Sequence, residues 1–216
     1  MHFAGTMSWQ IREGIDHNLA MALYVRDAAG LEPYVVTEPD VSVLDPPVPT
    51  HVATGGGDSS AQAMTDLRLA VREWPTWWTR ALQQVSATTP QEAQEAGPPA
   101  PPEWRGLQDL PTMRALAQLH HPDFWRWLDA PKHTERERQR GQHGGSDPLH
   151  LTHLVNGYER RLGRPVRPFT LHLRLLPLQQ SVGWVLDEQQ ILLSTRLRED
   201  AAAMERLLEP VILALA

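Results

Sequence analysis

The sequence contains no cysteine among its 216 residues. This absence excludes disulfide bonds, zinc sites built from thiolates and a cysteine nucleophile, and it is compatible with a reducing compartment. No apolar run approaches the roughly 18 residues of a membrane-spanning helix. The first residues, MHFAGTMSWQIREG, lack the basic start and apolar run of a secretory signal. We therefore expect a soluble, cytoplasmic protein without membrane association.

Lysine and two of the aromatic residue types are also scarce. Lys132 is the only lysine, and three Phe and three Tyr accompany eight Trp. The hydrophobic fraction of 41% and the charged fraction of 21% are ordinary for a globular protein, so a packed core is expected. Three of the tryptophans occur together in the segment WPTWWTRAL, residues 74 to 82.

These tryptophans belong to a segment with helical periodicity, residues 60 to 86. Apolar residues recur there at alternating steps of three and four: Met64, Leu67, Val71, Trp74, Trp78, Ala81 and Val85. Such a stripe predicts an amphipathic helix whose tryptophans enter the core, with Trp77 at the edge of the stripe and a kink or restart at Pro75. A ligand-stacking platform and an intermolecular helix seam remain as alternatives, and the second leaves homo-oligomerisation open.

Other helices are indicated by their start and stop signals. Asp16 or Asn18 can cap a helix that Gly30 ends, and Pro111 and Pro122 each open a helix. Ser146 or Asp147 can cap a further helix at residues 148–162. An extended hairpin turning at DAAG is an alternative for the first of these segments. In FWRWL, Phe124, Trp125 and Leu128 are expected to share the buried face, with Trp127 elsewhere.

The C-terminal quarter of the chain has strand character. In RPFTLHLRLLPL, alternate residues from Phe169 to Leu175 are apolar, while Thr170, His172 and Arg174 face the other way. Two further strands are expected at 183–187 and 191–195, joined at DEQQ, before a terminal amphipathic helix. The predicted fold class is α+β: mainly helical, with a small antiparallel three-stranded sheet near the C-terminus packed on the terminal helix.

Residues 87–104 are rich in proline and alanine and are typical of a linker or mobile loop. They would separate an N-terminal helical region with a loop-rich extended segment, residues 1–86, from residues 105–216, although both parts can form one domain. The three glycines at 55–57 precede a helix start, where backbone N–H groups could bind phosphate, but the spacing and the lysine of a P-loop are missing.

The histidines offer one candidate for chemistry. His150 and His153 lie three residues apart and would share a side of a helix, so a third ligand could complete a divalent-metal site. This pattern supports an alternative function as a histidine–metal-dependent hydrolase. Neither an HExxH motif nor a G-x-S-x-G motif is present. Without a third ligand in the spacing, we expect no metal or other cofactor and lean against an enzyme.

The charge distribution gives the main functional hypothesis. The chain has a net charge of −6, but residues 126–174 hold ten Arg or Lys against five Asp or Glu, a local charge of +5. Arginines gather there in two clusters: Arg136, Arg138 and Arg140, and Arg160, Arg161, Arg164 and Arg167. The second cluster predicts a non-catalytic interaction or assembly component that binds an acidic protein surface. Balance by acidic residues of the same chain and a nucleic-acid-associated role remain as alternatives.

Overall fold

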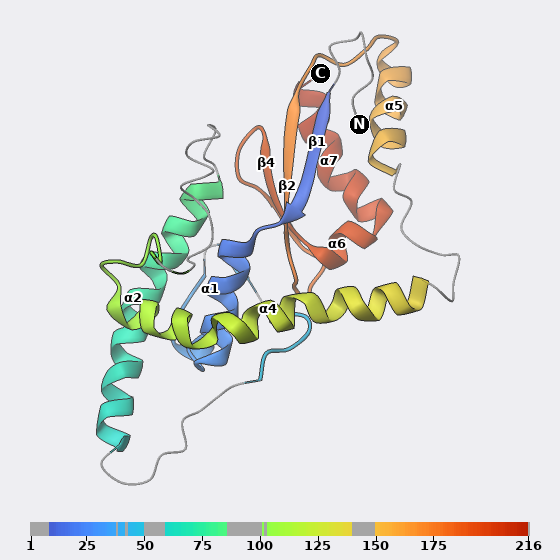
Figure 1. The fold of residues 1–216 in the computed structure, drawn as a ribbon. Coiled ribbons are helices and arrows are strands. Elements are labelled where there is room, and N and C mark those ends of the chain that lie inside the picture. Colours follow the sequence, from blue (N-terminus) through green and yellow to red (C-terminus); the bar gives the residue numbers. More distant parts are fainter. Residues whose placement is uncertain are drawn as a thin grey trace. The chain divides into compact units, whose positions relative to one another are not determined.

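The computed structural model describes residues 9–37, 39–41, 43–49, 59–85, 101, 103–139 and 150–215, with the backbone alone at 59–63, 131–139 and 150. These residues form an α+β fold with six α-helices and a four-stranded mixed sheet (Figure 1). Contacts divide the chain into two compact units. The first unit comprises the residues up to Ile15 and those from Arg136 onward, and the second runs from Asp16 to Glu135. The segment 87–104 lies largely outside the described residues, so the division proposed there stays a prediction.

The second unit begins with helix α1, His17–Ala28, which is buried on nearly all sides. As the sequence predicts, Asp16 caps this helix: its Oδ1 accepts a hydrogen bond from the backbone N of Leu19 at 3.0 Å. Gly30 follows the helix with a φ of +65°, a conformation in which glycine avoids the strain of a side chain. The hairpin alternative for this segment is therefore wrong. A short 3₁₀ helix, Glu32–Tyr34, comes next.

Helix α2, Ser59–Val85, is one continuous helix that contains Pro75. Trp74, Trp77 and Trp78 are all buried, which confirms the prediction that these tryptophans belong to the core. Trp77 is as deeply buried as its neighbours rather than at the edge of the stripe. The stripe is also shorter than predicted, because Met64 is 53% exposed.

Helix α4, Pro111–Gln139, replaces the two helices that the sequence predicts at Pro111 and Pro122. Pro122 lies on an exposed side of this helix, where the loss of one backbone donor is tolerated, while Ala117, His120 and Phe124 on the opposite side are buried. His120 is therefore a buried residue of the helix interior, with its ring edge-on to Tyr24, and not a helix-end residue.

The assignment within FWRWL is also corrected. Trp127, not Trp125, joins Phe124 and Leu128 in the buried face, because residues three and four apart lie over one another on a helix. The Trp127 indole N–H donates to the backbone O of Pro46 at 2.8 Å, which satisfies its polar atom inside the core.

The N-terminus of α4 is held by α2. The Oε2 atom of Glu73 accepts from the backbone N of Met113 at 2.9 Å, and its Oε1 accepts from the hydroxyl of Thr112 at 3.0 Å. One carboxylate thus satisfies an unpaired donor of the first helical turn, where negative charge is favoured.

The first unit contains the sheet, in the order β1-β2-β4-β3. Its elements are β1 Gln10–Ile15, α5 His150–Leu162, β2 Thr170–Leu176, β3 Gly183–Val185, β4 Gln190–Ser194, α6 Thr195–Glu199 and α7 Ala201–Leu215. β2 pairs in parallel with both β1 and β4, and only β3 is antiparallel to β4. The prediction of a three-stranded antiparallel sheet is therefore wrong, although the β3–β4 hairpin within it is confirmed.

Burial explains this strand order. All five residues of β4 are buried, as expected for a central strand, whereas β3 is partly exposed and lies at an edge. The consecutive apolar residues Ile191, Leu192 and Leu193 lack the alternation of a half-exposed strand. β1 at the other edge was not predicted, because Arg12 and Glu13 make its pattern irregular; charges are common on edge strands.

One face of the sheet packs against helices and forms the core of this unit. Figure 1 shows α5 and α7 on the same side of the sheet. The buried residues of this core come from β2, β4 and helices α5 to α7, and they include Leu171, Leu173, Ile191, Leu193 and Leu208. The predicted packing of the terminal helix on the sheet is confirmed. Among the described residues, no helix is long and apolar enough to cross a membrane.

Candidate interaction surface

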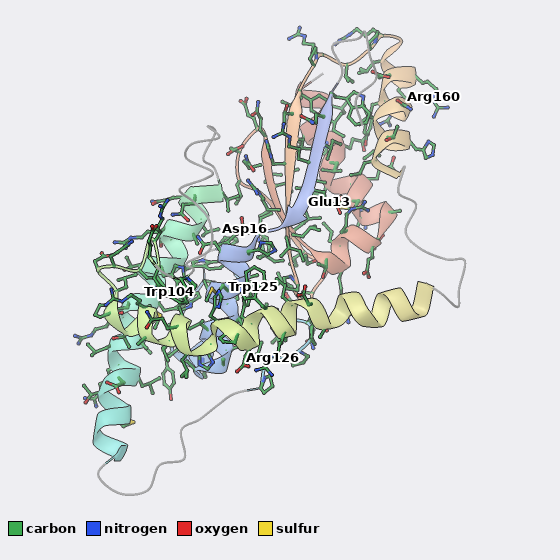
Figure 2. The ribbon with its side chains drawn as sticks, in the orientation of Figure 1. Glu13, Asp16, Trp104, Trp125, Arg126 and Arg160 are labelled. Atoms are coloured by element: carbon green, nitrogen blue, oxygen red, sulfur yellow. The ribbon has the colours of Figure 1, made fainter. Side chains whose placement is uncertain are left out.

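Helix α5 presents one side to the core and the other to solvent. Leu154, Val155 and Tyr158 are buried among residues of the sheet and of α7. Arg160 on the outer side is exposed and points away from the sheet (Figure 2). The 3.6-residue period of the helix thus directs its charged C-terminal turn outward.

The four predicted arginines are all exposed, and we call Arg160, Arg161, Arg164 and Arg167 the arginine surface. Gly163 ends the helix with a φ of +64° and turns the chain. The Oε1 atom of Glu159 then accepts from the backbone N of Val166 at 3.2 Å, which fixes the following loop beside the last helical turn. This turn brings Arg160 and Arg164, on either side of the helix end, to the lining of one hollow.

An open hollow lies within this region. It is lined by His153, Asn156, Glu159, Arg160, Gly163, Arg164 and Pro165. Arg160 Nε donates to the backbone O of Asn156 at 3.3 Å, and Arg164 Nη1 donates to the backbone O of Pro165 at 3.5 Å. These bonds orient the two guanidinium groups.

Arg161 differs from the other three arginines. Its Nη2 donates to Glu209 Oε1 of α7 at 2.8 Å, and its guanidinium lies 4.5 Å from the centre of the Tyr158 ring. The hydrogen bond to Glu209 raises the pKa of Arg161. Balance by an acidic residue of the same chain, one of the alternatives for this cluster, therefore applies to Arg161, which links α5 to α7.

The described residues do not test the metal site predicted at His150 and His153. His153 is exposed at the hollow, but the side chain of His150 lies outside the described residues. Within the part of the chain that the structure describes, no group of three His, Cys, Asp or Glu residues could hold a metal ion. The side chains of Arg136, Arg138 and Arg140, and the glycines at 55–57, also lie outside the described residues.

A second polar cluster was only partly visible in the sequence. The alternation in β2 places His172 and Arg174 on the face of the sheet opposite the apolar core residues. Arg12 joins them from β1, since its Cα pairs with that of His172. Sequence reasoning missed this juxtaposition because it did not predict β1.

An aromatic cluster in the second unit involves two histidines and two tryptophans. Trp125 Nε1 donates to His121 Nε2 at 3.0 Å, and the His121 ring lies edge-on to Trp104. His17 is also edge-on to Trp125, with ring centroids 5.1 Å apart. Because the indoles contact other rings of the unit, we assign this cluster to packing.

Comparison of this chain with protein-family models, with curated protein sequences and with solved structures finds no match. The function must therefore be argued from the residues themselves.

Proposed function

We propose that this chain is a non-catalytic interaction component that binds an acidic protein surface through Arg160, Arg164 and Arg167. The observation that carries this proposal is the exposure of these three arginines at and after the end of α5, where Arg160 and Arg164 line an open hollow. The apolar side of the same helix is committed to the core, so the polar side alone remains to meet a partner.

Helix stability does not account for the whole cluster. Cations near a helix C-terminus are favoured by the helix dipole, which gives Arg160 a structural role. Arg164 and Arg167 lie beyond the helix end at Leu162, where this effect falls away. Exposed ion pairs within a chain contribute only about 0–1 kcal/mol each, so stability is a weak reason for further arginines there.

Arginine chemistry favours carboxylates as the partner groups. The planar guanidinium group can bind a carboxylate through two parallel hydrogen bonds, which gives geometric selectivity as well as charge attraction. Arg161 is bonded to Glu209 of α7 and so links the two helices. Three outward arginines would bind several carboxylates of one acidic segment together.

Binding of a defined acidic probe tests the proposal. We expect the full chain to bind poly-glutamate in a saturable way that weakens as salt rises, since exposed charges are screened. The variant Arg160→Gln/Arg164→Gln/Arg167→Gln keeps long polar side chains and should lose most of this binding. The control Arg68→Gln/Arg72→Gln/Arg114→Gln removes three exposed arginines elsewhere and should retain it.

Two results would contradict this function. Equal losses in both triple variants would show that only net charge matters. Tighter binding of a single-stranded oligonucleotide than of poly-glutamate, lost in the first variant, would favour the nucleic-acid-associated alternative.

A further inference from the structure

The face of the sheet opposite the helices carries a row of polar side chains, which we call the polar face: Arg12, His172, Arg174 and Gln190. Arg12 pairs with His172 across β1 and β2, and His172 pairs with Gln190 across β2 and β4. Paired residues of neighbouring strands point to the same side, about 4.8 Å apart. Arg174 follows His172 by two residues, so its side chain leaves β2 on that side too.

Two atoms of this face lack hydrogen-bond partners in the described part of the chain. They are Gln190 Oε1 and Arg174 Nε, both buried, and Gln190 as a whole is only 3% exposed. Buried polar atoms in folded proteins are nearly always paired, with protein, water or ligand. An acceptor and a charged donor are thus left unpaired on neighbouring strands.

The two arginines of the polar face form no ion pair with a carboxylate of the described residues. Arg12 Nε donates to Gln10 Oε1 at 3.2 Å. Burial, followed by the charges of Arg174 and Arg12, lowers the pKa of His172. Asp187 acts in the opposite direction, but its Oδ1 already accepts from two backbone N–H groups of the β3–β4 turn.

There is also space for a ligand beside Arg174. Gly14 of β1 pairs with Arg174, and a Cβ atom built on this glycine would meet no other atom within 4 Å. A Cβ atom would therefore fit at this position without displacing a described residue.

From these observations we propose that the polar face binds inorganic hydrogen phosphate. Arg12 and Arg174 donate to the phosphate oxygens, a pairing that suits the guanidinium group. Gln190 Oε1 accepts a hydrogen bond from a P–OH group. Hydrogen phosphate carries such a hydroxyl, whereas sulfate has the same shape but offers no donor at neutral pH.

The test is a titration of the full chain with inorganic phosphate at pH 7, followed through the imidazole NMR signals of His172. These signals are assigned by their loss in His172→Gln. We expect a saturable shift, weaker binding of sulfate, and a loss of about tenfold or more in phosphate affinity in Arg174→Gln, since charged hydrogen bonds contribute strongly. A parallel titration with glycerol 3-phosphate should show weaker binding, as with sulfate, because its phosphate group is mostly a dianion without a P–OH group at pH 7.

Two further variants keep the test independent of the stability of Arg174→Gln. Gly14→Val should fill the open space and weaken binding, and Arg12→Gln should remove one donor. Arg68→Gln in α2 is the control and should bind phosphate as the wild type does. A shift that does not saturate, equal affinity for sulfate and phosphate, or unchanged affinity in Gly14→Val and Arg12→Gln would overturn the proposal.

Discussion

The indole Nε1 of Trp74 donates a hydrogen bond to the backbone O of Ala22 at 2.8 Å and so joins α2 to α1. The same indole is stacked on Trp78, with ring centroids 5.5 Å apart and planes 12° from parallel. Trp77 Nε1 donates to Asn18 Oδ1 at 3.2 Å. Because the polar atoms of Trp74 and Trp77 are paired inside the core, both residues contribute apolar area without the cost of an unpaired donor.

Replacement of Trp78 by alanine should destabilise the second unit by about 3–5 kcal/mol, because a large buried ring leaves a cavity. Urea unfolding followed by circular dichroism measures the effect. Leu69→Ala in the same helix is the control: its side chain is 42% exposed, and its loss should change stability by less than about 1 kcal/mol. Similar effects of the two substitutions would argue against a core role for Trp78.

A second prediction concerns the ion pair between Arg80 of α2 and Asp109, which precedes α4. The two guanidinium nitrogens Nη1 and Nη2 lie 2.7 Å from the two carboxylate oxygens, and Nη1 also donates to the backbone O of Gly106. The hydrogen bond from Arg80 is the main cause that lowers the pKa of Asp109 from 3.8 to about 2. Carbon-detected NMR titration of the Asp109 carboxyl group should report this low pKa.

In Arg80→Gln the pKa of Asp109 should rise toward its ordinary value, since the charged partner is gone. Because the folded-state pKa is depressed, the pair stabilises the fold above about pH 4 and loses this contribution as pH falls toward 2. Arg72→Gln, on an exposed side of the same helix, should leave the titration unchanged. An unshifted Asp109 in the wild type would mean that the pair does not persist in solution.

Local signals in the sequence were sufficient for elements whose structure depends on neighbouring residues. The Asp16 cap, the Gly30 stop and the alternation in β2 all concern residues a few positions apart, and each is present in the structure. The tryptophan helix followed from its apolar period in the same way.

Features that depend on contacts between residues far apart in the chain could not be predicted from local sequence patterns. Pro122 ordinarily marks a helix start, but tertiary packing of Phe124 and its neighbours keeps α4 continuous. The parallel pairing of β2 with β1 joins residues about 160 positions apart, and no local pattern encodes it. The arginine cluster was visible as composition, whereas the bond from Arg161 to Glu209 required the packing of α5 against α7.

The last prediction concerns the pH dependence of the first unit. Burial, together with the nearby charges of Arg174 and Arg12, lowers the pKa of His172 below its ordinary value of 6.5, and the carboxylate of Asp187 opposes this only in part. The folded state therefore binds fewer protons than the unfolded state just below pH 6.5. The free energy of unfolding should fall as pH decreases through this range, and the contribution of His172 should stop changing below its folded-state pKa.

The measurement is urea unfolding between pH 5 and pH 8, followed through the amide NMR signals of β2. In His172→Gln this part of the pH dependence should disappear, because glutamine does not titrate. Arg174→Gln should raise the folded-state pKa of His172 by removing a like charge, which narrows the pH range over which stability is lost. His153→Gln, on the exposed side of α5, serves as the control and should keep the wild-type profile in β2. If the free energy of unfolding of His172→Gln depended on pH as in the wild type, another group would cause the acid sensitivity of the sheet.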